Sequence, residues 1–139
     1  MIEDAVLKKA ANQCGGDYSS LKLLGGLNES VYNIKINDEN FVIKFFSADQ
    51  IDRSLIKGQL DWISYLAEAG MNIAEPMFSL QEQPIEEVRA NDSLYYYVLF
   101  EKVKGSLISE QGWKEELIQK WGRAMGKMHQ LAKDYTLSD

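Results

Sequence analysis

Hydrophobic and polar residues alternate along residues 21–46 in three short runs, and this alternation predicts three β-strands joined by two turns. The first connection, residues 25–30, is long for a hairpin and carries two adjacent glycines. The second, residues 37–40, is an ordinary polar turn.

The third of these runs carries a single lysine, Lys44, in an apolar strand. Side-chain alternation assigns the strand residues to two faces, with Val42, Lys44 and Phe46 on one and Phe41, Ile43 and Phe45 on the other. Because both faces are apolar, we expect this strand to be central. A lysine there either reaches solvent with its tip or meets an anion or an acceptor. A glycine-bearing loop followed by a strand lysine is also how kinase-type folds hold nucleotide phosphates.

Helical periodicity appears in three other segments. Residues 2–13 predict a short helix, residues 48–70 a second helix, and residues 109–135 a long amphipathic helix. Between the last two, residues 77–83 and 94–100 predict strands, the second of them strongly β-prone. The whole pattern is that of an α+β chain.

Gln59 lies at the centre of the stripe that we expect the second helix to turn toward the sheet. Its neighbours within about 60° on the helical wheel are apolar, and they are Leu55, Ile56, Trp62, Ile63 and Leu66. A polar side chain on a buried face needs a partner. Lys44 on the preceding strand is one candidate, and a backbone group is the other.

The long helix predicted at 109–135 has a wide apolar stripe, and no second domain follows it in the sequence. The stripe comprises Trp113, Leu117, Trp121, Met125, Met128, Ala132 and Tyr135. We expect further sequence or a partner to cover it, and self-association of the chain by itself. His129 lies on the same helix with no triad partner or metal-ligand set, so a structural role is favoured over a chemical one.

Composition excludes several classes of protein. A chain of 139 residues with 45% hydrophobic and 26% charged residues is typical of one soluble globular domain, and no apolar run approaches the ~20 residues needed to span a bilayer. A net charge of −6 argues against nucleic acid as the main partner. One histidine and one cysteine cannot assemble a zinc site.

The beginning of the chain and its cysteine content indicate a cytoplasmic location. Acidic residues at positions 3 and 4 stand where a signal peptide would carry lysine or arginine. The single cysteine, Cys14, forms no internal disulfide and suits a reducing compartment. We expect Cys14 to be a buried small hydrophobe rather than a reactive thiol.

The order of these pieces resembles the N-terminal lobe of the aminoglycoside phosphotransferase and choline kinase-like family, which has a protein-kinase-like fold. The segments that carry the resemblance are LLGGLNESVYNI (23–34), FVIKFF (41–46), LDWISYLAEAGMNIAEP (60–76), YYYVLFEKVKG (95–105) and WGRAMGKMHQL (121–131). The resemblance implies an antiparallel sheet of about five strands with one packed helix, a short helix before it and a long helix after it. Residues 1–103 would form the nucleotide-binding lobe, and residues 104–139 the connector and first long helix of a truncated C-terminal lobe.

The resemblance also implies roles for individual residues. The loop from 25 to 30 would cover the phosphates of ATP or GTP, two valines would close on the purine, and residues 101–103 would form the hinge whose backbone groups bond the base edge. The residues concerned are Gly25, Gly26, Asn28, Ser30, Val31, Val42, Glu101 and Val103. Lys44 would contact the α- and β-phosphates. Gln59 stands where the family has an acid that orients this lysine, and an amide oxygen accepts a hydrogen bond without adding formal charge.

Phosphoryl transfer in this family needs further residues that the chain does not contain. The catalytic aspartate of an HxD-type loop and the asparagine and aspartate that hold Mg²⁺ lie in the C-terminal lobe, whereas His129 is followed by Gln-Leu-Ala-Lys. We therefore expect the nucleotide-binding part of a small-molecule kinase, not catalytic by itself. The complete enzyme would move the γ-phosphoryl of ATP or GTP, with Mg²⁺, to a hydroxyl of an aminoglycoside, choline, homoserine or a similar acceptor.

The alternative is a non-catalytic kinase-like module that binds a protein partner through the helix at 113–135. The glutamine at position 59 favours this second interpretation.

Overall fold

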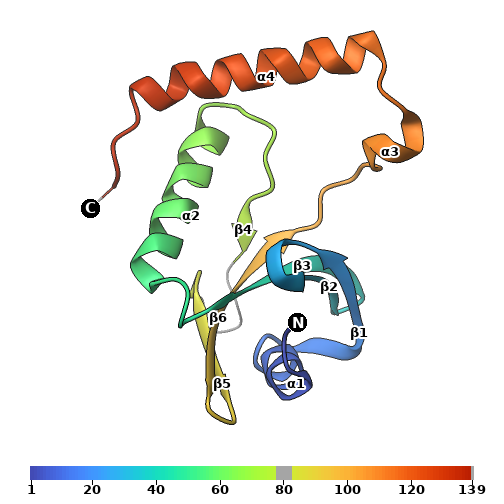
Figure 1. Cartoon of the computed structure of the whole chain (residues 1–139), viewed down its shortest axis with the longest axis vertical. Coiled ribbons are helices and arrows are strands. Elements are labelled where there is room, and N and C mark those ends of the chain that lie inside the picture. The colour runs from blue at the N-terminus through green and yellow to red at the C-terminus, as the bar shows by residue number, and fades with distance from the viewer. Residues whose placement is uncertain (78–82, 139) are drawn as a thin grey trace.

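The computed structural model describes residues 1–77 and 83–138, and within them an antiparallel sheet of six strands forms the centre of the fold (Figure 1). The strands are β1 (Gly16–Gly25), β2 (Val31–Ile36), β3 (Glu39–Ser47), β4 (Pro76–Met77), β5 (Glu86–Ala90) and β6 (Ser93–Glu101). Their order is β1-β2-β3-β6-β4, and β5 also pairs with β6. β3 is thus central, as its two apolar faces predicted.

Four helices accompany the sheet in the described residues. They are α1 (Asp4–Gln13), α2 (Arg53–Glu68), α3 (Ile108–Gln111) and α4 (Glu115–Lys133), and a short 3-10 turn, η1 (Leu27–Glu29), follows β1. Within this part of the chain, none of the helices combines the length and the apolar character needed to cross a membrane. Figure 1 shows α1 on one side of the sheet, α2 on the other, and α4 lying across the far end of α2.

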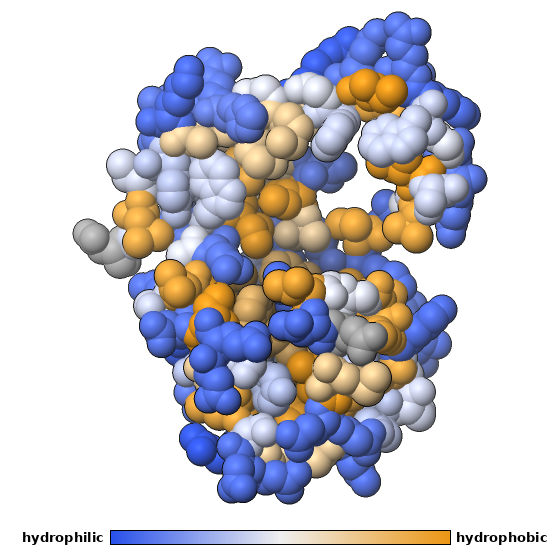
Figure 2. All heavy atoms as spheres, in the orientation of Figure 1, coloured by the Kyte–Doolittle hydropathy of each residue, from blue (hydrophilic) through white to orange (hydrophobic). Residues whose placement is uncertain are grey.

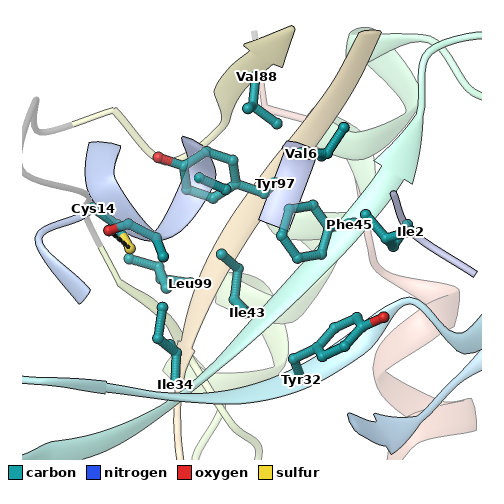
Figure 3. Close-up of a cluster of buried hydrophobic side chains, with 12 residues drawn as sticks. Ile2, Val6, Cys14, Tyr32, Ile34, Ile43, Phe45, Val88, Tyr97 and Leu99 are labelled. Atoms are coloured by element: carbon teal, nitrogen blue, oxygen red, sulfur yellow. Dashed lines mark hydrogen bonds between the residues drawn. The ribbon is translucent and has the colours of Figure 1, made fainter. Parts of the chain in front are cut away.

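One face of the sheet packs against α1. Its inward residues alternate along β2, β3 and β6, and the core is made of Ile34, Ile43, Phe45, Val88, Tyr97 and Leu99 with Val6 and Ala10 of the helix (Figure 3). Cys14 is buried at the edge of this core, where its thiol donates to the Ala11 carbonyl at 3.4 Å. Burial raises the pKa of the Cys14 thiol, which disfavours the reactive thiolate. The prediction of a buried small hydrophobe is confirmed.

The opposite face packs against α2 through a smaller core. Ile56 and Leu60 of the helix meet Val98 of β6 and Ile85, with Phe46 half-buried beside them. β3 and β6 therefore contribute alternate residues to both cores, which is why these two strands are apolar on both faces.

The predicted α+β architecture is confirmed, with differences at several boundaries. β5 lies in residues 84–93, for which the sequence pattern predicted no strand; its alternate residues Glu86 and Val88 are buried, and Glu87 between them is exposed. β4 is a two-residue strand, and the rest of the strand predicted at 77–83 lies largely outside the described residues. α2 begins at Arg53 rather than near 48.

The single long helix predicted at 109–135 is wrong in its first part, because the segment is divided into α3 and α4. Gly112 separates them with a φ of 78°, a left-handed conformation that a helix cannot contain. Trp113 therefore precedes α4 instead of opening its apolar stripe, and its ring lies 5.9 Å from that of Trp121.

The C-terminal end of α4 is fastened to α2 by aromatic and polar contacts. The Tyr65 hydroxyl donates to the Leu131 carbonyl at 2.9 Å, and the Tyr135 hydroxyl donates to Asp61 Oδ2 at 2.6 Å. The Tyr135 ring lies 4.8 Å from Trp62 and 5.1 Å from Tyr65. These groups form the α2–α4 clasp, defined here as Asp61, Trp62, Tyr65 and Tyr135.

We predict that acid weakens this clasp. Asp61 accepts hydrogen bonds from the Tyr135 hydroxyl and the Ser138 amide, and these bonds hold the pKa of its carboxyl below the usual value. Because the folded pKa is lowered, the stabilisation is present above the unfolded value of about 3.9 and is lost as the pH falls through the folded pKa. In an NMR titration the Ser138 amide signal should move with a midpoint below that value.

Asp61→Asn is the matched control for this titration, since it keeps the side-chain shape and removes the titrating group. The Ser138 signal of this variant should lose the acid transition. A midpoint at or above the unfolded value in the unmodified chain would contradict the assignment.

Candidate functional site

A pocket of about 620 Å³ opens beside Lys44, between the loop that follows β1 and the beginning of α2. Side chains of both sheet faces and of the N-terminal residues contribute to its walls. Those that bear on its chemistry are Leu27, Asn28, Ser30, Lys44, Gln50 and Gln59. One cation with several uncharged hydrogen-bonding groups is a lining suited to an anion that carries many oxygen atoms.

Glycine is required at the start of the loop by close packing. A side-chain carbon at Gly26, whose φ is 86°, would lie 2.6 Å from a methyl group of Val31. Gly25 also has a positive φ, of 125°. These two residues therefore let the chain turn tightly out of β1 and approach β2 closely.

The end of the loop is tied to β3 next to the lysine. The Ser30 hydroxyl donates to the Leu27 carbonyl at 2.8 Å, and the Phe45 amide donates to the Ser30 carbonyl at 2.9 Å. Asn28, which has a left-handed φ of 58°, reaches Gln50 at 3.5 Å on the opposite wall of the pocket. Gln50 carries no sequence signal of a site residue, because nothing in a loop before a helix distinguishes a pocket-lining glutamine from a solvated one.

Lys44 occupies β3 directly opposite Val31 of β2 and Val98 of β6. Its ammonium nitrogen lies 4.9 Å from the centre of the Phe46 ring, a cation–π contact with the next residue on the same face. Among residues 1–77 and 83–138, no carboxylate lies within ion-pair distance of this ammonium group. Its hydrogen-bond donors are thus available to a ligand in the pocket.

The expected burial of Gln59 is wrong. α2 meets the sheet along a narrow line through Ile56 and Leu60, so Gln59 and Leu55 fall at the edge of the contact and are exposed, Leu55 by 59%. In the described part of the chain, neither a bond to Lys44 nor one to a backbone group is present on Gln59. Its side chain nevertheless lines the same pocket as Lys44.

The residues predicted to form the hinge lie where β6 ends. The Glu101 amide donates to the Glu75 carbonyl at 3.1 Å, and the Glu75 amide donates to the Glu101 carboxylate at 3.2 Å. Val103 follows in a stretch without regular structure and is 58% exposed. A second pocket of about 460 Å³ lies at this end of the sheet, and Glu75 and Glu101 contribute to its wall together with Phe41.

Val31 and Val42 lie on the sheet face that carries Lys44. Val31 is the direct cross-strand neighbour of the lysine, and Val42 precedes it by two residues on β3. The structure thus brings the loop, Lys44 and Gln59 to one pocket and Glu101 to another, with the face that bears Val42 between them. The role of each residue in binding a nucleotide remains a prediction.

The remaining chemical predictions concern a metal site and His129. Across the described ranges, no group of three or more histidine, cysteine, aspartate or glutamate side chains is arranged to hold a metal ion. His129 is exposed on α4.

Comparison with known proteins was made with the sequence and with the fold. No family model matches the chain. Amicoumacin kinase of Bacillus subtilis (strain 168) is 28% identical over 138 residues, which cover 99% of this chain and 41% of that protein. The chain therefore spans about two fifths of the length of this curated relative.

Two solved structures share the fold. Amicoumacin kinase hAmiN in complex with AMP-PNP, Ca²⁺ and Ami matches with a TM-score of 0.82 and 26% identity, over 100% of this chain and 42% of that one. The microcompartment-associated aminopropanol kinase matches with a TM-score of 0.77 and 20% identity, over 95% of this chain and 42% of that one, and it supports the fold alone. The chain is homologous to an N-terminal-lobe part of amicoumacin kinase, and it has the kinase-like fold that the sequence predicted.

Proposed function

We propose that this chain is the nucleotide-binding lobe of a small-molecule kinase, whose complete form transfers the γ-phosphoryl group of a nucleoside triphosphate to a hydroxyl group. The observation that carries the proposal is Lys44, a strand lysine without a described carboxylate partner that faces a pocket under the 25–30 loop. A solved structure that is 26% identical to this chain contains AMP-PNP and Ca²⁺. This similarity supports a nucleotide with a divalent metal as the ligand of the Lys44 pocket.

The lining of the pocket fits a triphosphate. Lys44 would neutralise charge on the α- and β-phosphates, while Asn28, Ser30 and the loop amides would donate to phosphate oxygens. Val31 and Val42 would close on the purine, and Glu101 to Val103 would present backbone groups to its edge. ATP or GTP with Mg²⁺ is the proposed ligand, and the metal supplies charge neutralisation when bound.

The proposed acceptor is a small molecule with a hydroxyl group, such as an aminoglycoside, choline or homoserine. The name of the curated relative, amicoumacin kinase, supports a small-molecule acceptor for this chain's complete form. The proposed location is the cytoplasm, where nucleoside triphosphates are available.

Exposed apolar side chains on the C-terminal segment favour a second candidate, the non-catalytic module that binds a protein partner. Trp113, Trp121 and Ile118 are exposed by 59%, 57% and 49%. Figure 2 shows apolar side chains beside an open gap between this segment and the sheet. The kinase proposal accounts for the same surface, since the curated relative contains more than half of its length beyond the match and that sequence can cover it.

We predict that Lys44→Ala lowers nucleotide affinity of the complete protein by at least tenfold. The variant removes a charge-assisted hydrogen bond, which is worth ~1.5–3 kcal/mol, and tenfold corresponds to about 1.4 kcal/mol. Calorimetric titration with Mg-ATP and Mg-GTP measures the change. Lys35→Ala, which removes an exposed strand lysine elsewhere on the sheet, should leave affinity unchanged. Equal affinities of the unmodified protein and Lys44→Ala would refute the role of Lys44.

We predict that Gln59→Glu changes the rate of nucleotide turnover by less than about fivefold. Gln59 is exposed, and an exposed ion pair with Lys44 would contribute only ~0.2–1 kcal/mol. Steady-state turnover of the complete protein with an accepted substrate provides the measurement. An inactive protein that gains activity only with this carboxylate would instead support the non-catalytic module.

We predict that residues 1–139 by themselves associate through the segment that carries the two tryptophans. The rings of Trp113 and Trp121 contact each other in a tilted arrangement but are largely open to solvent, so a second copy can remove them from water. Light scattering at increasing concentration should show dimers or larger species. Trp121→Lys should restore the monomer, whereas Leu24→Lys on β1 should not, and a chain that is monomeric at high concentration would overturn the prediction.

A further inference from the structure

A chain of three polar side chains crosses the sheet where the hinge begins. The Lys102 ammonium group donates to Asn33 Oδ1 at 2.7 Å, and Asn33 Nδ2 donates to Asn40 Oδ1 at 3.0 Å. The three residues come from the connector after β6, from β2 and from β3. They link the first connector residue to two strands that are far from it in the sequence.

Asn33 is the buried member of this chain, with 7% of its surface exposed. Its neighbours on β2, Tyr32 and Ile34, point to the opposite face and belong to the core under α1. Asn33 lies directly opposite Val42, on the face that carries Lys44. An amide placed there among valines has no role in apolar packing, so its two hydrogen bonds are what it contributes.

Both ends of the Asn33 amide are satisfied in a way that fixes its orientation. The carbonyl oxygen faces an ammonium group, which only donates, and the nitrogen faces the Asn40 oxygen. Turning the amide over would place its NH₂ group against the Lys102 ammonium. The Lys102 side chain is therefore held at a defined place on the sheet, although most of the residue is exposed.

The beginning of the hinge is consequently held from two sides. Glu101 is bonded to Glu75, which leads into β4, through one bond in each direction. Lys102 is bonded to β2 through Asn33. From residue 102 to residue 107 the chain has no regular structure, so these contacts determine the direction in which it leaves the sheet.

We propose that Asn33 is a positioning residue of the nucleotide site, which binds the Lys102 ammonium group and thereby fixes the hinge backbone that receives the nucleotide base. This inference rests on the proposed function. Asn33 acts on the ligand through Lys102. The pair contributes to nucleotide affinity, as Lys44 does, and leaves the rate of the transfer step unchanged.

The test is a double-mutant cycle in the complete protein, with Mg-ATP and Mg-GTP as the varied substrates. Lys102→Met keeps the alkyl chain and removes the ammonium group, and Asn33→Leu removes the amide. Each should raise the nucleotide KM about tenfold with kcat changed less than twofold, and the double variant should be no worse than either single one, because both remove the same contact. Thermal unfolding of every variant checks that it is folded.

Two further variants make the test specific. Lys104→Met removes an exposed connector lysine that makes no hydrogen bond or ion pair in the described structure, and it should leave KM unchanged. Asn33→Asp keeps the shape and the acceptor for Lys102, and it should retain a KM close to that of the unmodified protein. A merely structural role of Asn33 would lower the unfolding temperature without moving KM.

The outcomes separate this inference from the proposed function. If the unmodified protein neither binds nor turns over a nucleotide, the proposed function fails and this inference fails with it. If Lys44→Ala weakens binding while Lys102→Met and Asn33→Leu leave KM unchanged, the proposed function stands and the positioning role is refuted. Additive effects of the two substitutions would also refute it, since the residues would then act independently.

Discussion

The pairing of β3 between β2 and β6 is the constraint on which the rest of the structure depends. It sets Lys44 opposite Val31 on one side and Val98 on the other, and it makes both faces of the strand available for packing. A shift of the register by one residue would turn Lys44 into the core under α1 and Ile43 toward the pocket. The two apolar faces prevent that shift, because each is matched to a different helix.

The two faces of the sheet differ in how completely a helix covers them. The α1 face is a closed apolar core in which Phe45, Ile43 and Tyr97 are almost fully buried. The opposite face is covered by α2 only along a narrow line, which leaves room for a pocket beside Lys44. The apolar core under α1 is thus closed, whereas the face under α2 leaves the polar region around Lys44 open to a ligand.

The environment of Lys44 is compatible with a glutamine at position 59. The ammonium group contacts the Phe46 ring instead of a carboxylate, and Gln59 contributes a neutral amide to the pocket wall. An exposed acid at that position would add little through a pair with the half-buried Lys44, because one partner stays in water. A glutamine in place of the expected acid therefore alters the charge of the pocket more than it alters the fold. The TM-score of 0.82 with the amicoumacin kinase structure is consistent with an unaltered fold.

The sequence by itself determined the α+β class, the strand that carries Lys44, its two faces and the loop at Gly25–Gly26, because alternation and glycine placement are local properties. It did not determine the rotation of α2, the break at Gly112 or the bonds of Asn33. Those depend on which distant segments meet: the position of Gln59 follows from how closely α2 approaches the sheet, and Lys102 reaches Asn33 across a separation of 69 residues. Periodicity records how a segment presents its side chains, whereas only the assembled sheet and helices decide what each side chain contacts.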